Sequence, residues 1–371
     1  MIRRPSRRAY VGQWLLLLAL VAVGWLMVNT VSENLARKHL PFGFAFLGQE
    51  SHFDIPFHLI GWTVFNTYAR ALLVSLLNTV LVSVMGIVAA TLLGLLVGIM
   101  RLSVNWLVRN IALAFIEFVR NTPQLVQIIF WYVGVLQTLP SPRQSIVLPG
   151  GVLLNIRGLY IPDAIMNPDR DLLSWLALAC LAATPFVWWL RIGDVRIGRK
   201  ALLLPLLALA FLAAGVDHLV YPELKGFNLA GGTQVPPELV ALWAGISIYA
   251  SAFIAEIVRG SIEAIPKGQH EAALAIGLRP WQRLALVVLP QALRIMVPQM
   301  TSQYLNLIKS SSLGAAIAYP ELFAIFTGTV LNQSGKEIET ISIVVAIFLT
   351  LNLLTSLLMN WYNQRVALVE R

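Results

Sequence analysis

The sequence contains a single cysteine, Cys180, and only 12% of its 371 residues are charged. One cysteine excludes a disulfide framework and a thiolate metal site within one chain. The five histidines do not occur in a pattern such as HExxH, which would place two metal ligands on one helix face. Soluble domains carry about 25% charged residues. The composition therefore argues against a disulfide scaffold, a metalloenzyme and a soluble domain.

A phosphate-binding loop of the form GxxxxGK[ST] is also missing. Gly335-Lys336 is followed by Glu337, and no glycine stands five residues before Gly335. The sequence therefore offers no phosphate cradle of its own. If ATP drives the function of this chain, another polypeptide binds the ATP and Mg²⁺.

Apolar residues, by contrast, make up 58% of the chain. Runs of eighteen or more recur, which is typical of an all-α polytopic membrane protein. We expect about eight membrane helices, at residues 14–31, 71–100, 111–136, 172–190, 201–220, 239–258, from about 293 onward, and 341–360. The first run is long enough to span, and no clear cleavage site follows it, so we interpret it as a retained helix rather than a signal peptide.

The net charge of +9 is explained by where the basic residues fall. Segments expected on the cytoplasmic side hold 17 Lys and Arg, and those expected outside hold 8. This bias matches the positive-inside rule and places both termini in the cytoplasm. The same bias explains the net positive charge without a nucleic-acid partner.

Two spans carry polar groups that are costly in a membrane. The third contains Glu117 and Arg120 just before Pro123, and the seventh contains Asn306 and Lys309. Intramembrane ionisable residues indicate a functional site by default, although Glu117 and Arg120 could simply satisfy each other as an i,i+3 pair. Lys309 adjoins three serines, but neighbouring residues on a helix point in different directions. Polar lining or interhelical hydrogen bonding is therefore favoured over a serine–lysine nucleophile.

A long polar connection between two apolar spans includes the stretch EAALAIGLRPWQRLALVVLP, Glu271–Pro290. Pro266 suits the first turn of a helix, and residues 267–276 favour helix. Gly277 can end that helix in the left-handed conformation. Pro280 can begin a second short helix that Pro290 ends. The pattern predicts a helix–turn–helix at the membrane surface.

This stretch resembles the EAA loop of membrane subunits of binding-protein-dependent ABC importers. The matching positions are Glu271, Ala272, Ala273, Gly277, Leu289 and Pro290, with Val287 where the family has isoleucine. The resemblance implies a type I importer permease core whose cytoplasmic loop, residues 258–295, docks on an ATPase and couples nucleotide-driven closure to the membrane helices.

Three further matches narrow the resemblance to the polar amino-acid branch of this family. They are EFVRNTPQLVQ at 117–127, AEIVRGSIEAIPKGQHEAA at 255–273, and LPQALR, LIKSSSL and PEL between 289 and 322. The resemblance covers 71–137 and 239–361 but not 138–238. The extra first helix and the insertion look like the longer general L-amino-acid permeases, which pair with a second permease.

We expect the chain to be organised in three parts. Residues 1–70 hold a first membrane helix and an extracytoplasmic segment, 71–137 and 239–371 form the two parts of the permease core, and 138–238 is an insertion with two further membrane helices. The function implied is ATP-driven L-amino-acid import across a bacterial inner membrane, with partner ATPases, a second permease and a periplasmic binding protein. Glu117, Arg120, Asn306 and Lys309 are candidate pathway residues. An amino-acid carrier driven by an ion gradient is the alternative, and an intramembrane enzyme is a further one. Neither alternative explains the EAA stretch Glu271–Pro290.

Overall fold

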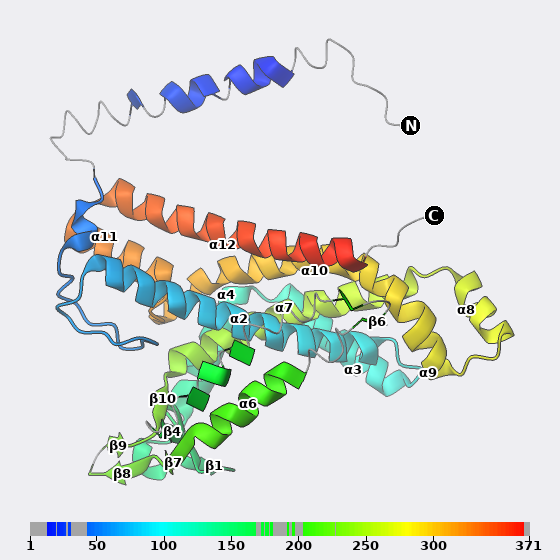
Figure 1. Cartoon of the computed structure of the whole chain (residues 1–371), viewed down its shortest axis with the longest axis horizontal. Helices are drawn as coiled ribbons and strands as arrows, with labels where there is room; N and C mark the ends of the chain where they lie inside the picture. Colours follow the sequence, from blue (N-terminus) through cyan, green and yellow to red (C-terminus); the bar gives the residue numbers. More distant parts are fainter. Residues whose placement is uncertain are drawn as a thin grey trace. The chain divides into compact units, whose positions relative to one another are not determined.

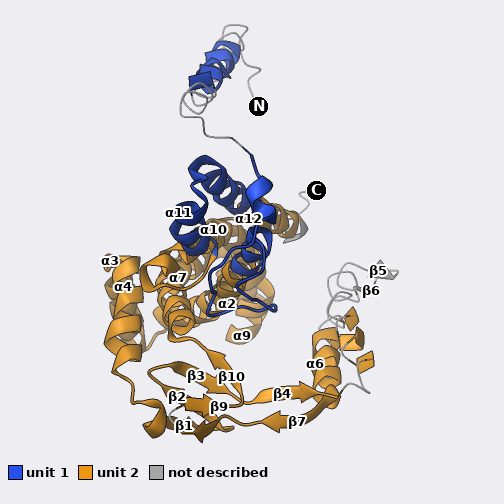
Figure 2. Cartoon of the chain, turned by 90° about the vertical axis from the view of Figure 1, so that its left-hand side faces the viewer, with its two compact units in different colours: residues 1–76, 322–350 blue, residues 77–321, 351–371 orange. Residues whose placement is uncertain are grey.

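The computed structural model describes residues 13–19, 21–26, 29–30, 43–167, 172–173, 175–177, 179–180, 191–192, 195–196, 203–226 and 228–366 (Figure 1). The chain divides into two compact units, coloured in Figure 2. Unit 1 comprises residues 1–76 and 322–350, and unit 2 comprises residues 77–321 and 351–371. Helices α2 (Tyr68–Arg101) and α12 (Glu337–Val366) contribute residues to both.

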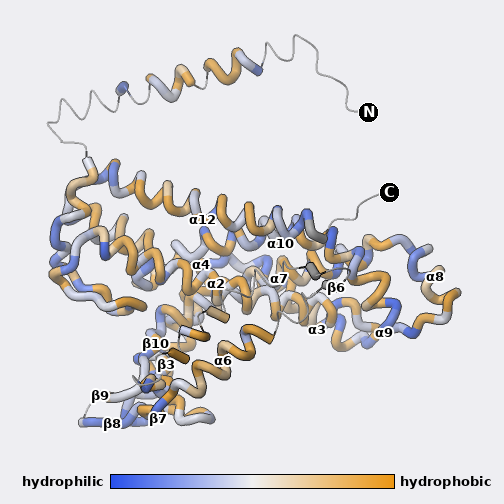
Figure 3. Tube along the Cα trace, viewed as in Figure 1, coloured by the Kyte–Doolittle hydropathy of each residue, from blue (hydrophilic) through white to orange (hydrophobic). Residues whose placement is uncertain are grey.

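Four helical stretches among the described residues are long and apolar enough to cross a membrane: Tyr68–Arg101, Pro237–Glu263, Pro280–Ile317 and Glu337–Gln364. Apolar residues run along α2 and α12 in Figure 3. These stretches confirm the predicted second, sixth, seventh and eighth spans. The first apolar run is helical where it is described, at 13–19 and 21–26. Most of the predicted fourth span, 172–190, lies outside the described residues, so the count of eight stays a prediction.

The predicted third span is not one helix. It consists of α3 (Trp106–Asn121), α4 (Gln124–Ile129), a π-helical turn (Phe130–Val135) and a 3-10 turn (Leu136–Thr138). Thr122 between α3 and α4 is extended, with φ −102° and ψ 129°. A proline disfavours helical backbone at the residue before it and cannot donate to the preceding turn, so Pro123 produces this break.

Unit 1 has an aromatic core of its own. Phe46 of the 3-10 helix Ala45–Gly48 packs against Tyr68, with ring centroids 5.9 Å apart. The Tyr68 hydroxyl donates to Gln333 Oε1 at 3.3 Å. Buried Leu322, Phe326 and Val344 complete this cluster. The segment before α2 is therefore folded onto the parts of α2 and α12 that belong to this unit.

The aromatic residues Trp62, Phe65 and Tyr68 suggest a helix at the membrane interface, but residues 61–67 are not helical. Trp62 and Tyr68 are buried in the core of unit 1, whereas Phe65 is 69% exposed. The chain between them makes a turn in which the Thr63 N–H donates to the Asn66 side chain at 2.9 Å. Aromatic spacing alone does not separate a membrane-interface helix from a turn whose rings fold inward.

Unit 2 is built around α7. Among the described residues, the helices of unit 2 after α4 include α6 (Leu203–Gly215), α7 (Pro237–Glu263), α8 (Lys267–Ala275), α9 (Pro280–Arg283), α10 (Leu289–Ser310) and the C-terminal part of α12. Helix α7 packs against α3, α4 and α10. Glycines allow close helix contact: a Cβ added at Gly94 of α2 would lie 2.5 Å from Ile254 Cγ2, and one at Gly245 would lie 2.5 Å from Ile128 Cγ1. Small residues commonly permit such approach between membrane helices.

The insertion contains strands, so the expectation of an all-α chain is wrong in detail. A four-stranded antiparallel sheet has the order β1-β2-β3-β10, and β4–β7, β5–β6 and β8–β9 are two-stranded pairs. The strands are β1 (Ile146–Leu148), β2 (Val152–Asn155), β3 (Gly158–Ile161), β4 (Asp163–Met166), β5 (Arg191–Ile192), β6 (Val195–Arg196), β7 (Val216–Val220), β8 (Glu223–Lys225), β9 (Asn228–Ala230) and β10 (Thr233–Val235).

The predicted fifth span, 201–220, mixes two elements. Helix α6 ends at Gly215, and Val216–Val220 forms strand β7, which pairs with β4. A 13-residue helix reaches about 20 Å, less than the ~30 Å hydrocarbon core. A short apolar run does not by itself distinguish helix from strand, which explains the error. Residues 1–12 and 197–200, which include Arg199 and Lys200, lie outside the described residues.

Candidate functional site

The EAA loop (residues 258–295) has the predicted first helix and turn. Helix α8 begins after Pro266 and ends before Gly277, whose φ is +76°. The Gly277 N–H donates to Leu274 O at 2.9 Å, and the Leu278 N–H donates to Ala273 O at 3.1 Å. These two bonds form a Schellman motif, in which a left-handed glycine satisfies the last carbonyls of a helix. The predicted conformation of Gly277 is confirmed.

The second helix of the loop does not end at Pro290, contrary to expectation. Pro280 begins α9 as predicted, but the chain continues through a π-helical turn, Leu284–Val288, into α10. Pro290 stands in the first turn of α10. Proline removes one backbone donor, and a π turn just before it shifts the hydrogen-bond register so that the helix continues. The loop is therefore joined to α10 by continuous helical backbone.

The tip of the loop exposes large apolar side chains. Ile276 is 75% exposed and Trp281 is 64% exposed, and Leu274 and Leu284 beside them are also exposed. Ala273 is buried against the loop itself, whereas Glu271 and Ala272 face outward. A cluster of exposed apolar residues on a polar surface marks an interaction site. Sequence analysis missed Ile276 and Trp281, although both lie within the recognised stretch.

A bond between side chains ties the two halves of the loop together. Gln291 Nε2 on α10 donates to Gln269 Oε1 on α8 at 3.2 Å and to the Val287 carbonyl at 2.9 Å. Leu289 is partly exposed next to Pro290. The bond between Gln291 and Gln269 links α8 to the start of α10.

A cleft of about 370 Å³ lies within unit 2, among α4, α7 and α10. Its lining includes amide, aromatic and basic side chains: Gln124, Tyr249, Phe253, Gln303, Asn306, Lys309 and Ser310. The Ser310 hydroxyl donates to Gln124 Oε1 at 3.0 Å, which joins α10 to α4 across the cleft. No carboxylate lines the cleft within the described part of the chain. Clefts of 300–1,000 Å³ with a few convergent polar groups are typical of small-molecule sites.

The four candidate pathway residues have different positions. Asn306 and Lys309 line the cleft. The Arg120 guanidinium lies 5.3 Å from the ring centroid of Phe253, itself a lining residue. Glu117 is not part of the lining and accepts a hydrogen bond from Asn121 Nδ2 at 3.3 Å. Arg120 therefore interacts with an aromatic ring rather than with Glu117.

The serines beside Lys309 donate to other groups. Ser311 and Ser312 donate to the Ile308 and Lys309 carbonyls, both at 2.7 Å, and Ser310 donates to Gln124. In this arrangement Lys309 Nζ does not activate a serine hydroxyl, since none of the three bonds involves that nitrogen. The geometry agrees with a lining role for Lys309.

Comparison with known proteins shows which family this architecture belongs to. A family model described as "binding-protein-dependent transport system inner membrane component" matches residues 90–368. The chain belongs to this family. The family model covers α3, α7, the EAA loop and α10, so the loop and the cleft both lie within the part that defines a binding-protein-dependent transport component.

Two similar proteins align with this transport component over nearly its full length. The "putative amino-acid ABC transporter permease protein YhdX" of Escherichia coli is 45% identical, covering 99% of this chain and 96% of YhdX. The "general L-amino acid transport system permease protein AapQ" of Rhizobium johnstonii is 44% identical, covering 99% of this chain and 94% of AapQ. Both alignments include the insertion at 138–238.

A solved structure also shares the fold of this transport component. The structure titled "Crystal structure of an amino acid ABC transporter with histidines" aligns with a TM-score of 0.51 and 18% identity, covering 80% of this chain and 95% of the matched chain. At this identity the match supports the fold alone. The chain is thus a multi-pass inner-membrane transport component with the fold of an ABC transporter permease.

Proposed function

We propose that this chain is a permease subunit of an ATP-driven L-amino-acid importer in a bacterial inner membrane. The observation that carries the proposal is the near full-length similarity to YhdX and AapQ, both named as amino-acid permeases. The EAA loop gives the mechanism by which such a subunit would use ATP that it does not bind itself.

The EAA loop would dock on a partner ATPase. Its exposed apolar tip around Ile276 and Trp281 supplies the contact surface, and the Gly277 turn fixes its shape. Glu271 would make a polar contact at the edge of this surface. Closure of two ATPase subunits would move the loop, and the unbroken path from Pro280 into α10 would carry that movement to the cleft.

The cleft within unit 2 would form this chain's half of the translocation pathway. An amino-acid carboxylate would be met by Lys309, while the amide oxygens of Gln303 and Asn306 and the ring of Tyr249 would face the ammonium group. Charge interactions in a partly dry site are stronger than in water. A second permease would supply the remaining wall, and a periplasmic binding protein would deliver the substrate.

The proposed topology keeps both termini in the cytoplasm. Residues 71–137 and 239–371 would form the transport core, and 138–238 would add the strand-containing insertion with the short apolar helix α6. This arrangement puts the EAA loop, which follows α7, on the same side as the termini. Glu117 would brace the α3–α4 break through Asn121 rather than bind substrate.

The test is affinity purification of the tagged chain from its native membrane in mild detergent, followed by mass spectrometry. The proposal predicts a stoichiometric ATPase with a Walker motif and a second EAA-containing permease. Recovery of the chain alone, or as a homo-oligomer without an ATPase, would contradict the proposal and favour the ion-gradient carrier.

A further inference from the structure

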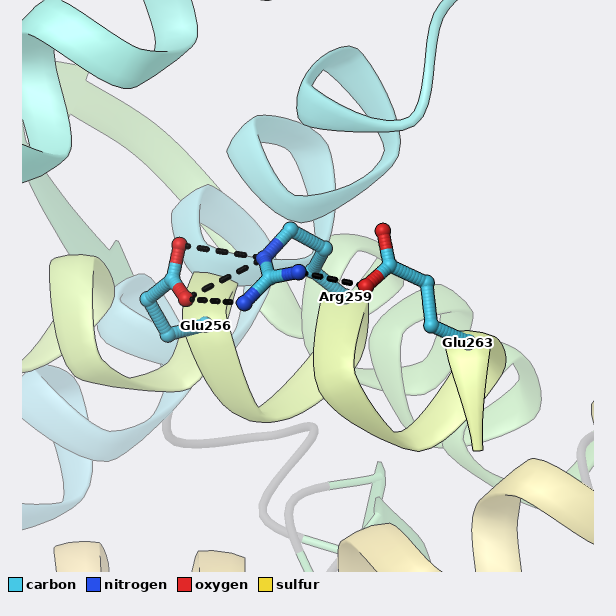
Figure 4. A network of polar contacts seen from close by, with 3 residues as sticks. All are labelled: Glu256, Arg259 and Glu263. Carbon is cyan, nitrogen blue, oxygen red and sulfur yellow. Dashed lines mark hydrogen bonds and ion pairs between the residues drawn. The ribbon is translucent and has the colours of Figure 1, made fainter. Parts of the chain in front are cut away.

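The cytoplasmic end of α7 carries three charged side chains in one network (Figure 4). Arg259 Nε and Nη2 donate to Glu256 Oε2 at 3.1 and 2.8 Å, and Arg259 Nη1 donates to Glu263 Oε2 at 2.5 Å. The three residues lie at i, i+3 and i+7, on one face of the helix. One guanidinium thus joins two carboxylates across the last two turns of α7.

The network counteracts an unfavourable charge arrangement. Helix α7 ends at Glu263, and a helix C-terminus carries partial negative charge that disfavours a nearby carboxylate. Without Arg259, two carboxylates would share the final turns without a cation. The planar guanidinium is suited to this position because it can donate to two groups in fixed directions, which a lysine ammonium cannot match.

Only three residues, 264–266, separate this network from α8. The Ala264 N–H still donates to Gly260 O at 3.0 Å, and Ile265 is buried. The direction in which α8 leaves α7 is therefore set by the last helical turn, which contains Glu263. Any loosening of that turn would change the orientation of the EAA tip.

We propose that Arg259 is a positioning residue that fixes α8 relative to α7 and thereby sets how much substrate moves for each ATP hydrolysed. This inference rests on the proposed function, because it assumes that the loop docks on an ATPase. Arg259 does not line the cleft, so its loss alters coupling rather than substrate recognition.

The two arms of the network differ in exposure. The Glu256 side chain is 24% exposed and that of Glu263 is 54% exposed. Exposed ion pairs are weakened by solvent and salt and contribute little to overall stability. The inner Glu256 arm is therefore the stronger of the two and holds the guanidinium in place, and the outer Glu263 arm links that guanidinium to the final turn.

The experiment uses the complete transporter in proteoliposomes with its ATPases, second permease and binding protein. Arg259→Gln is compared with Arg259→Lys, Glu263→Gln and the wild type. The readouts are substrate molecules imported per ATP hydrolysed and the binding-protein concentration that gives half-maximal ATPase stimulation. Arg109→Gln on α3 is the matched control, since Arg109 is exposed and makes no ion pair within the described residues.

Arg259→Gln should lower the import-to-ATP ratio several-fold while half-maximal stimulation stays unchanged. Arg259→Lys should fall between it and the wild type, and Glu263→Gln should have a smaller effect. Should Arg259→Gln fail to assemble, the Lys and Glu263 variants still decide the question. A wild-type ratio in Arg259→Lys and Glu263→Gln, or an equal fall in Arg109→Gln, overturns the inference. A wild-type complex without ATP-driven import would instead refute the proposed function.

Discussion

The Tyr319 hydroxyl donates to the backbone carbonyl of Asn78 at 3.1 Å, and the Asn78 side-chain amide donates to the carbonyl of Pro320 at 2.9 Å. Both side chains are fully buried. They join α2 to the irregular backbone after α10, where Ala318 is left-handed. Irregular backbone at membrane depth requires internal hydrogen bonds, and this pair provides two.

Replacement of Tyr319 by phenylalanine should therefore destabilise the chain modestly. The ring remains and one hydrogen bond is lost, so we expect a cost of about 1 kcal/mol. Asn78→Ala should cost more, about 1–3 kcal/mol, because it leaves a buried carbonyl without its donor. Thermal unfolding of the purified chain in detergent measures both. An equal, negligible change in the two variants would contradict this account.

Substitutions at Gly277 should disturb coupling in a graded order. A β-branched residue is strained at φ +76°, by roughly 1–2 kcal/mol, whereas asparagine tolerates this region better. Gly277→Val should therefore insert normally but import poorly, and Gly277→Asn should be intermediate. Import rate at equal membrane abundance is the measurement.

Gly268→Ala is the control for this series, since a Cβ at Gly268 on the same loop would meet nothing within 4 Å. Full import by Gly277→Val would show that the left-handed turn is not needed for coupling.

A Gly94→Val variant should disrupt the packing of α2 on α7. The added Cβ would lie 2.5 Å from Ile254 Cγ2, and overpacking of this kind costs about 1–3 kcal/mol. The smaller change Gly94→Ala combined with Ile254→Ala should cost less stability than the sum of the two single changes, because the truncated side chain makes room for the added Cβ. Thermal unfolding of the two single variants and the double variant in detergent measures this. Strictly additive losses would argue against direct contact.

Two glutamines on α10 allow a cleft-lining side chain to be compared with one on the exposed helix surface. Gln303 lines the cleft, whereas Gln299, one turn earlier, is exposed and donates to the Ile295 carbonyl of its own helix. Gln303→Ala should weaken binding of a labelled amino acid to the purified complex without binding protein. Gln299→Ala should leave it unchanged.

Lys309→Gln should weaken that binding further. A charge-assisted hydrogen bond is worth about 1.5–3 kcal/mol, which corresponds to roughly tenfold or more in Kd. Equal effects at Gln303 and Gln299 would indicate that the cleft is not the substrate site.

Much of the helical framework could be predicted because long apolar runs have few alternatives in a membrane protein. Helices α2, α7 and α12 were expected from such runs. The break at Pro123 is explained by proline geometry, but residues 111–136 were expected to form one span. The strands of the insertion could not be predicted, because each has only two to five residues. Two of the pairings also join strands that are distant in sequence, β3 with β10 and β4 with β7. Pro290 was misassigned because proline suits both the end of one helix and the first turn of the next.

The candidate site was only partly accessible from the sequence. Asn306 and Lys309 stood out as polar residues in an apolar span, and both line the cleft. Gln124, Tyr249 and Phe253 carry no charge and come from two other helices, so only the packing of α4 and α7 against α10 brings them to the site. The pairing of Arg120 with Phe253 rather than Glu117 depends on the same packing.

The most direct test of the central claim is uptake of labelled L-amino acids by proteoliposomes that contain the complete complex, with the binding protein on the outside. Ion gradients are collapsed with ionophores, and ATP or ADP is enclosed. The account predicts accumulation with ATP and none with ADP, and loss of accumulation in Gly277→Val. Two results would contradict the account. One is accumulation with ADP in a parallel sample without ionophores and with an imposed ion gradient. The other is loss of accumulation when ionophores are added although ATP is present.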